Sequence, residues 1–242
     1  MKIDILTLFP EQIEAVLGGS IIGRAQAAGI VSIEAHNIRD YTLSKQKRVD
    51  DSPYGGGAGM VMQCEPLSRC LDAVKNGEKV HTILMSPRGK VFNQEKAREL
   101  ASLGRFAIVC GHYEGIDQRF IDECVDEEIS LGDFVLTGGE IAAMAVSDAV
   151  CRLIPGVLSE TVCFEDESHW NGLLEYPQYT RPEVWNGIPV PPVLLSGHHK
   201  NIEEWRMYQS LTITKEKRPD MYEKITLTKA QQKILKKFEE TK

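Results

Sequence analysis

Residues 130–140 read S-L-G-D-F-V-L-T-G-G-E, and this stretch decides how the rest of the chain is interpreted. It places three glycines, two hydroxyl residues and two carboxylates between a strand pattern and a helix pattern. An ordinary connection of this kind needs one glycine or one helix cap. Gly132, Gly138 and Gly139 leave backbone N–H and C=O groups uncovered by side chains, so a ligand can approach them closely. The stretch therefore predicts a ligand-binding loop at the end of a strand.

Two more glycine-bearing loops lie upstream. Residues 85–89 (M-S-P-R-G) follow the apolar run 80–84, and residues 110–115 (C-G-H-Y-E-G) follow the apolar run 106–109. In open α/β sheets, ligands bind outside the carboxyl ends of the strands. We therefore expect all three loops at the ligand-binding edge of one sheet.

Apolar runs and helical patterns alternate over the first two thirds of the chain. Such alternation predicts an α/β fold in which helices cover both faces of a parallel sheet. The pattern alone favours an unknotted, doubly wound sheet, because knots are nearly absent from proteins. The predicted strands are residues 3–9, 31–38, 81–84, 106–109 and 128–131. The predicted helices are residues 11–17, 20–29, 65–75, 93–102, 116–124 and 140–153.

The chain changes character after residue 158. Residues 159–171 carry mixed acids without a clear period and are interpreted as an interdomain linker. The first domain then spans residues 1–158 and the second spans residues 172–242. Helical patterns at 202–210, 219–225 and 229–240 predict that the second domain is small and mostly helical.

Composition indicates a globular protein. The 242 residues are 42% hydrophobic, which is ample for a buried core. No apolar run approaches the ~20 residues of a membrane span, and no signal-peptide pattern precedes the first strand. We therefore expect a cytoplasmic protein with no membrane partner. The six cysteines show no C-x-x-C pair and no zinc spacing, so neither a disulfide framework nor structural zinc is indicated.

Charge is spread unevenly along the chain. The net charge is −7, but residues 198–242 hold 11 Lys and Arg against 7 Asp and Glu, a net charge of +4. A basic tail on an acidic body fits an RNA partner held at one end. The alternative is a solvated helical tail.

The three loops, together with Y-G-G-G-A-G-M at 54–60 and Y-T-R-P at 179–182, resemble the bacterial tRNA (guanine-N1)-methyltransferases of the SPOUT class. The resemblance extends from M-K-I-D at the start to P-P-V-L-L-S-G-H at 191–198. It implies methyl transfer from S-adenosyl-L-methionine to N1 of guanosine 37 in tRNA, by a homodimer. It also implies a C-terminal trefoil knot in the first domain and a tRNA-binding second domain. The competing hypotheses are a SPOUT enzyme for another RNA position, a non-catalytic RNA-binding protein, and a generic α/β enzyme for small nucleotides.

The resemblance also implies which residues bind the methyl donor. Ala142 departs from the proline of several family members, and because alanine favours helices we expect little effect there. Glu114 has a structural alternative, as an acid near the start of the helix at 116–124. The residues matching the family's donor site are Met85, Ser86, Pro87, Gly111, Tyr113, Glu114, Ser130, Leu131, Gly132, Phe134, Leu136, Gly138 and Gly139.

Guanine N1 holds its proton at neutral pH, so methyl transfer calls for a general base. The family's catalytic aspartate aligns with Glu167, while a shift of one residue selects Asp166; the alternative is that both are solvated linker acids. Arg152 matches an arginine that donates to guanine O6, although it also suits a helix C-terminus. The resemblance implies a magnesium dependence, but no ligand cluster in the sequence locates the ion. Four residues are expected to hold the RNA backbone: Arg181, Ser196, Gly197 and His198.

Overall fold

The protein was analysed as a computed structural model, which describes residues 1–158 and 167–240. The chain divides into two compact units, Met1–Thr161 and Val162–Lys242. This division falls inside the stretch 159–171 that the sequence predicts as a linker.

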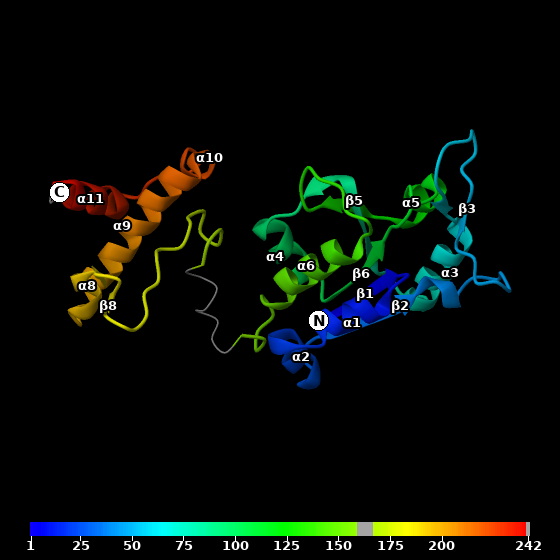
Figure 1. Cartoon of the computed structure of the whole chain (residues 1–242), viewed down its shortest axis with the longest axis horizontal. Helices are drawn as coiled ribbons and strands as arrows, with labels where there is room; N and C mark the ends of the chain where they lie inside the picture. The colour runs from blue at the N-terminus through cyan, green and yellow to red at the C-terminus, as the bar shows by residue number, and fades with distance from the viewer. Residues whose placement is uncertain (159–166, 241–242) are drawn as a thin grey trace. The chain divides into compact units, whose positions relative to one another are not determined.

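A five-stranded sheet forms the centre of the first unit (Figure 1). Its order is β2-β1-β6-β5-β7, and every neighbouring pair is parallel. The prediction of a parallel sheet is therefore confirmed. The strands are β1 (Lys2–Thr7), β2 (Ser32–Asn37), β5 (His81–Val91), β6 (Arg105–Cys110) and β7 (Glu127–Ser130).

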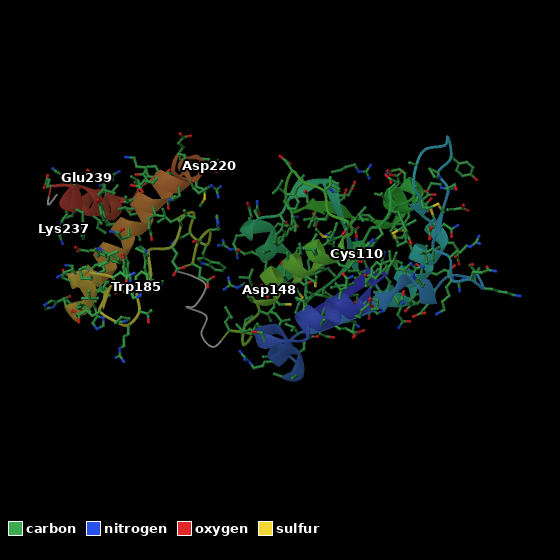
Figure 2. The ribbon with its side chains drawn as sticks, in the orientation of Figure 1. Cys110, Asp148, Trp185, Asp220, Lys237 and Glu239 are labelled. Carbon is green, nitrogen blue, oxygen red and sulfur yellow. The ribbon has the colours of Figure 1, made fainter. Side chains whose placement is uncertain are left out.

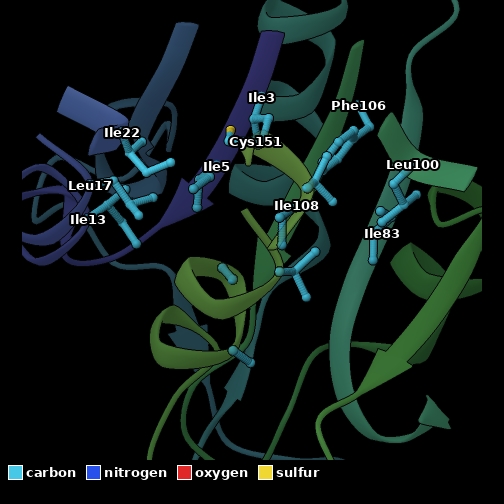
Figure 3. Close-up of a cluster of buried hydrophobic side chains, with 14 of the residues drawn as sticks. Ile3, Ile5, Ile13, Leu17, Ile22, Ile83, Leu100, Phe106, Ile108 and Cys151 are labelled. Atoms are coloured by element: carbon cyan, nitrogen blue, oxygen red, sulfur yellow. The ribbon is translucent and has the colours of Figure 1, made fainter. Parts of the chain in front are cut away.

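Helices cover both faces of this sheet, as predicted. Along β6, Phe106 and Ile108 point into one core, and Ala107 and Val109 point into the other, because side chains alternate along a strand. The first core, shown in Figure 3, is covered by α1 (Pro10–Leu17), α2 (Ser20–Ala27), α4 (Gln94–Ser102) and α6 (Glu140–Cys151). The second core is covered by α3 (Cys64–Lys75) and α5 (Gln118–Cys124).

Strand β5 is longer than the sequence predicts. Met85 and Lys90 both pair with Ile129, so residues 86–89 bulge out before the strand resumes. Gly89 permits this return, because a Cβ atom there would lie only 2.4 Å from the backbone carbon of Glu128. The prediction that the strand ends at Leu84 is therefore wrong. Residues 86–90 (S-P-R-G-K) include no apolar strand former, so no apolar pattern extends the predicted strand to Val91.

A short two-stranded ribbon, β3 (Asp50–Asp51) and β4 (Val61–Met62), was not predicted. It carries the glycine-rich segment 55–59 at its end. The N–H of Met62 donates to Gly115 (2.9 Å), and the N–H of Asp117 donates to Met62 (3.0 Å). The ribbon is thereby tied to the loop that follows β6. A 3₁₀ turn, η1 (Ile38–Asp40), precedes it.

The described part of the second unit is mostly helical. Its longest helix, α9, packs against α11, where Tyr208 stacks on Phe238 with ring centroids 4.6 Å apart. A capping box of Thr228 and Gln231 starts α11. The helices are α8 (Pro192–Leu195), α9 (His199–Lys217), α10 (Pro219–Tyr222) and α11 (Lys229–Glu239); a hairpin of β8 (Val184–Trp185) and β9 (Ile188–Pro189), not predicted, precedes them.

None of the described helices is long and apolar enough to cross a membrane. The cysteines at 64, 70, 110, 124 and 151 are free thiols.

A buried ion pair joins three strands of the sheet. Asp4 on β1 is fully buried; its Oδ2 lies 3.1 Å from Nε of Arg105 on β6, and its Oδ1 lies 2.9 Å from Nε2 of His36 on β2. Burial acts to raise the pKa of Asp4, but the hydrogen bonds from His36 and Arg105 outweigh it and hold that pKa below its ordinary value of 3.8. The carboxylate therefore stays charged in the folded protein.

We expect Asp4→Asn to lower the free energy of unfolding by about 3 kcal/mol at neutral pH, because it breaks a buried ion pair. Since the folded pKa is depressed, the stabilisation is present above pH 3.8 and is lost as pH falls through the folded value. Urea unfolding measured at several pH values tests both points. Asp40→Asn, which breaks the exposed pair with Lys47, is the control and should cost less than about 1 kcal/mol. Equal losses in the two variants would contradict the assignment.

Candidate active site

A cavity of about 390 Å³ lies beside the bulge of β5 and the carboxyl ends of β6 and β7 in the first unit. Its walls come from the three glycine-bearing loops. Of the thirteen residues expected to bind a methyl donor, all but Gly132 line it: Met85, Ser86, Pro87, Gly111, Tyr113, Glu114, Ser130, Leu131, Phe134, Leu136, Gly138 and Gly139. Gly132 adjoins the lining, because its N–H donates to the Ser130 hydroxyl at 3.1 Å.

The cavity lining has a buried apolar part and an exposed part of mixed character. Leu84, Ile121 and Ile129 line the cavity and are buried. The exposed lining includes the charged residues Arg88 and Glu114 as well as apolar side chains such as Phe134 and Val135. This arrangement suits a flat ring with a charged tail, because the ring is buried while the charges stay near water.

The helix-start loop packs directly on the end of β6. The N–H of Gly139 donates to the carbonyl of Gly111 at 3.0 Å. A Cβ atom on Gly139 would lie 2.7 Å from the Cα atom of Cys110, which Figure 2 labels. A Cβ atom on Gly138 would lie 2.2 Å from the ring of His112. Glycine is therefore needed at 139 because two backbone segments meet there, and at 138 because a side chain would collide with the His112–Glu140 pair.

A buried carboxylate lies behind this contact. Glu140 is 3% exposed; its Oε1 accepts from the Thr7 hydroxyl at 2.5 Å, and its Oε2 lies 2.7 Å from Nε2 of His112. The His112 ring also packs on Phe9, with centroids 5.0 Å apart. Glu140 thus joins the end of β1, the cavity wall and the start of α6. No sequence pattern predicted a role for Thr7, His112 or Glu140. The one sequence feature that could have indicated this hydrogen-bonded group was a histidine in one glycine-bearing loop and an acid in another.

The opposite wall rests on the ribbon β3–β4. The N–H of Glu114 donates to the carbonyl of Met60 at 3.0 Å, and a Cβ atom on Gly59 would lie 2.5 Å from Oε1 of Glu114. Helix α5 begins at Gln118 and is capped by Asp117, not by Glu114. Hydrogen bonds from Arg119 hold the pKa of Asp117 well below its usual value. The carboxylate of Glu114 therefore has no part in capping this helix.

The expected catalytic residues come from both units. Arg152 is the C-cap residue of α6 in the first unit, as its alternative role at a helix end suggested. Glu167 belongs to the second unit, is half-buried, and accepts the Trp170 N–H at 3.3 Å through its carbonyl. Asp166 lies outside the described residues.

The residues expected to hold RNA all lie in the second unit. Ser196 caps the C-terminus of α8, and its hydroxyl accepts from the N–H of His198 at 3.2 Å. Gly197 between them has a φ of 68°, a conformation that favours glycine. The structure therefore brings Ser196, Gly197 and His198 together in one turn. Arg181 is exposed.

One group of side chains among the described residues has metal-ligand spacing: Asp4, Glu34 and His36. Asp4 is already bonded to His36 and Arg105. Nζ of Lys2 lies 3.6 Å from Asp4 and 3.1 Å from Glu34. Because cations already neutralise these carboxylates, the group does not fit a magnesium ion, which prefers oxygen ligands and bound water.

Comparisons with known proteins agree on one family. The family model described as tRNA (Guanine-1)-methyltransferase TrmD matches residues 1–224. Relatives named tRNA (guanine-N(1)-)-methyltransferase come from several bacteria. The one from Ruminiclostridium cellulolyticum is 59% identical over 93% of this chain and 97% of its own length. Those from Clostridium novyi and Clostridium perfringens strain 13 are 57% and 58% identical over 97% and 98% of this chain, and 97% and 99% of their own lengths.

We expect Gly139→Ala to lower the free energy of unfolding by about 1–3 kcal/mol, because the new Cβ atom overpacks against the Cys110 backbone. The variant should also weaken S-adenosylmethionine binding, since the displaced loop lines the cavity. Urea unfolding and titration calorimetry measure the two effects. The control is Gly19→Ala, where the nearest atom would be 3.9 Å away. Wild-type stability and affinity in Gly139→Ala would show that the contact tolerates a side chain.

Proposed function

The chain belongs to the tRNA (guanine-1)-methyltransferase family, and from this premise we propose that it transfers a methyl group from S-adenosyl-L-methionine to N1 of guanosine 37 in tRNA. The observation that carries the proposal is the cavity. Residues from three separate segments, selected by their match to the family, line one hollow beside the bulge of β5 and the carboxyl ends of its neighbours β6 and β7. Ligands bind at this edge in α/β sheets.

The cavity suits the methyl donor in shape and charge. When bound, S-adenosylmethionine supplies an electrophilic methyl group on a sulfonium sulfur. The buried apolar lining at Leu84 and Ile129 can take up a ring, and main-chain groups of the lining, such as those of Gly138, can hydrogen-bond to its edge. The Glu114 carboxylate favours a positively charged ligand. The protein's remaining task is to align the acceptor and remove its proton.

A carboxylate from residues 166–167 is proposed as the general base. Glu167 takes the N1 proton as N1 forms its bond to the methyl carbon, and the carbon–sulfur electron pair returns to sulfur. Asp166 is the alternative base. Arg152 is proposed to donate to guanine O6, where negative charge develops as N1 loses its proton. No step is assigned to magnesium, because the only described group with ligand spacing does not fit it.

The second unit is proposed to hold the tRNA. Its turn at Ser196, Gly197 and His198, together with Arg181, offers donors to phosphates, and the basic tail adds charge. Tyr179 is 48% exposed and is available to stack on an unpaired base. A protein that acts on tRNA is expected in the cytoplasm.

The homodimer and the trefoil knot are also proposed. A groove of about 410 Å³ between α1, α2 and α6 is largely apolar. Val16 and Ile141 line it and are 58% and 56% exposed, so a second copy of the chain would bury apolar surface there. For the knot, support comes from the family and from the close packing of loops at the ends of β5, β6 and β7. A crystal structure in which these loops do not thread would reject it.

The function predicts a specific product. Purified protein, S-adenosylmethionine and a tRNA transcript with guanosine 37 should give 1-methylguanosine at that position. Nuclease digestion with mass spectrometry identifies the base and its place. A transcript with adenosine 37 should remain unmodified. Methylation at another position or on ribose would replace the proposed acceptor.

If Glu167 is the base, Glu167→Gln should lose roughly 10²- to 10⁴-fold in single-turnover methyl transfer. Asp166→Asn should be mild, and S-adenosylmethionine affinity should hold in both variants. The loss should shrink as pH rises, because more guanine then loses its proton unaided. A severe Asp166→Asn with a tolerated Glu167→Gln would move the role to Asp166. Full methyl transfer by the double variant would show that neither carboxylate is the general base.

Sedimentation should give about twice the 27.1 kDa mass of one chain. Ile141→Lys should shift the protein toward the monomer, because it places a charge in the apolar groove. Val91→Lys is the matched control: Val91 is equally exposed but does not line the groove. A monomeric wild type would reject the homodimer.

A further inference from the structure

The cavity contains one strong cation. Arg88 is the only Arg or Lys among the residues that line it. Arg39 comes near, with its guanidinium 3.4 Å from the Tyr113 hydroxyl, but it is not part of the lining. His112 lines the cavity but is bonded to Glu140. A negatively charged part of any ligand therefore has one partner with a permanent positive charge.

The backbone of Arg88 is held in place. Its N–H donates to the Ser86 hydroxyl at 3.2 Å, and Gly89 beside it packs against the backbone of Glu128. The bulge in β5 therefore presents Arg88 at a fixed point of the cavity wall. A fixed backbone lowers the entropy that a ligand contact must offset.

The side chain is less constrained. It is 58% exposed, and its Nη1 and Nη2 atoms lie 3.4 Å from Gln118 and 3.3 Å from Glu128, both long for hydrogen bonds. The Gln118 amide nitrogen donates to Asp122 at 2.7 Å, which turns its oxygen toward Arg88. The guanidinium is thus oriented by weak contacts and has donors to spare, because arginine carries five.

We infer that Arg88, oriented by Gln118, binds the α-carboxylate of the donor's amino-acid end and makes the cavity select for adenosine derivatives that carry this group. The inference rests on the proposed function. A ring buried against Leu84 and Ile129 leaves the charged amino-acid end to the exposed part of the lining, to which Arg88 belongs. A guanidinium matches a carboxylate in shape and charge and can bond to both oxygens.

Three ligands separate this role from a general effect on the cavity. S-adenosylmethionine and S-adenosylhomocysteine carry the carboxylate, whereas 5′-methylthioadenosine lacks the whole amino-acid end. S-adenosylhomocysteine and 5′-methylthioadenosine are both uncharged at sulfur, so a difference between their affinities does not come from a sulfonium charge. Dissociation constants by titration calorimetry are needed for the wild type, Arg88→Ala, Arg88→Lys and Lys90→Ala. Lys90→Ala is the matched control, because it removes an exposed positive charge two residues away that does not line the cavity.

We expect Arg88→Ala to weaken S-adenosylmethionine and S-adenosylhomocysteine by about tenfold or more, the usual effect of losing a hydrogen-bonded charge pair. Binding of 5′-methylthioadenosine should change by less than about threefold on the same grounds, and this binding also reports that the variant is folded. The affinities of Arg88→Lys should lie between those of the wild type and Arg88→Ala, since lysine keeps the positive charge but cannot bond to both carboxylate oxygens with two parallel N–H groups. Lys90→Ala should match the wild type.

Equal weakening of all three ligands would overturn the inference and make Arg88 a structural residue of the bulge. Unchanged affinities would overturn it as well. In both cases the proposed function stands if the wild type binds S-adenosylmethionine and methylates tRNA. A wild type that binds no S-adenosylmethionine would reject the proposed function and this inference together.

Discussion

The approach of two backbone segments, at Gly139 and at Cys110, is the constraint on which the cavity depends. Any side chain at 139 would meet the Cα atom of Cys110 at 2.7 Å, so the chain can close here only through glycine. The contact is stabilised by the hydrogen bond that the N–H of Gly139 donates to the carbonyl of Gly111. Once these segments are in place, α6 starts at Glu140 and the three loops face one space. A loss of this contact would open the cavity although no cavity-lining side chain had changed.

Burying the Glu140 carboxylate behind the contact is costly unless it is compensated. Three features provide the compensation: the Thr7 hydroxyl, the His112 ring and the positive end of α6. Asp4, on the same strand as Thr7, is compensated in a comparable way by His36 and Arg105. Strand β1 therefore has one satisfied polar link at Asp4 and another at Thr7, with the apolar residues Ile5 and Leu6 between them. Such links fix the register of a strand more sharply than apolar packing does, since a slip would leave buried charges unpaired.

Apolar periodicity predicted the sheet and both helix layers, because it reports local structure. The resemblance to the family, and not the periodicity, selected twelve of the twenty-three residues that line the cavity. The sequence could not predict features that depend on pairing between distant residues. Strand β5 resumes after its bulge only because Lys90 and Val91 pair with β7, and β3 and β4 have two residues each. Thr7 and Glu140 are 133 positions apart, so no spacing rule joins them. Which of Glu167 and Asp166 is the general base stays a prediction. The sequence around them has no helix or strand period, so no pattern shows whether the alignment is shifted by one residue.

Main-chain groups of the glycine-bearing loops can hydrogen-bond to a ring, but they distinguish charged from neutral ligands poorly, because they carry only partial charges. Selection by charge then depends on charged side chains of the lining, among which Arg88 and Glu114 have opposite signs. An amino-acid end is a zwitterion, and a pair of opposite charges complements it better than either charge alone. The polyanionic acceptor needs something different. The first unit has 16 Lys and Arg against 23 Asp and Glu, so its net charge repels phosphates. The second unit is balanced, with 12 against 12, and its positive charge is concentrated in residues 198–242, which have a net charge of +4. The proposed division of the two tasks between the units would let an acidic first unit keep a pocket for a cationic donor while the basic residues 198–242 attract RNA.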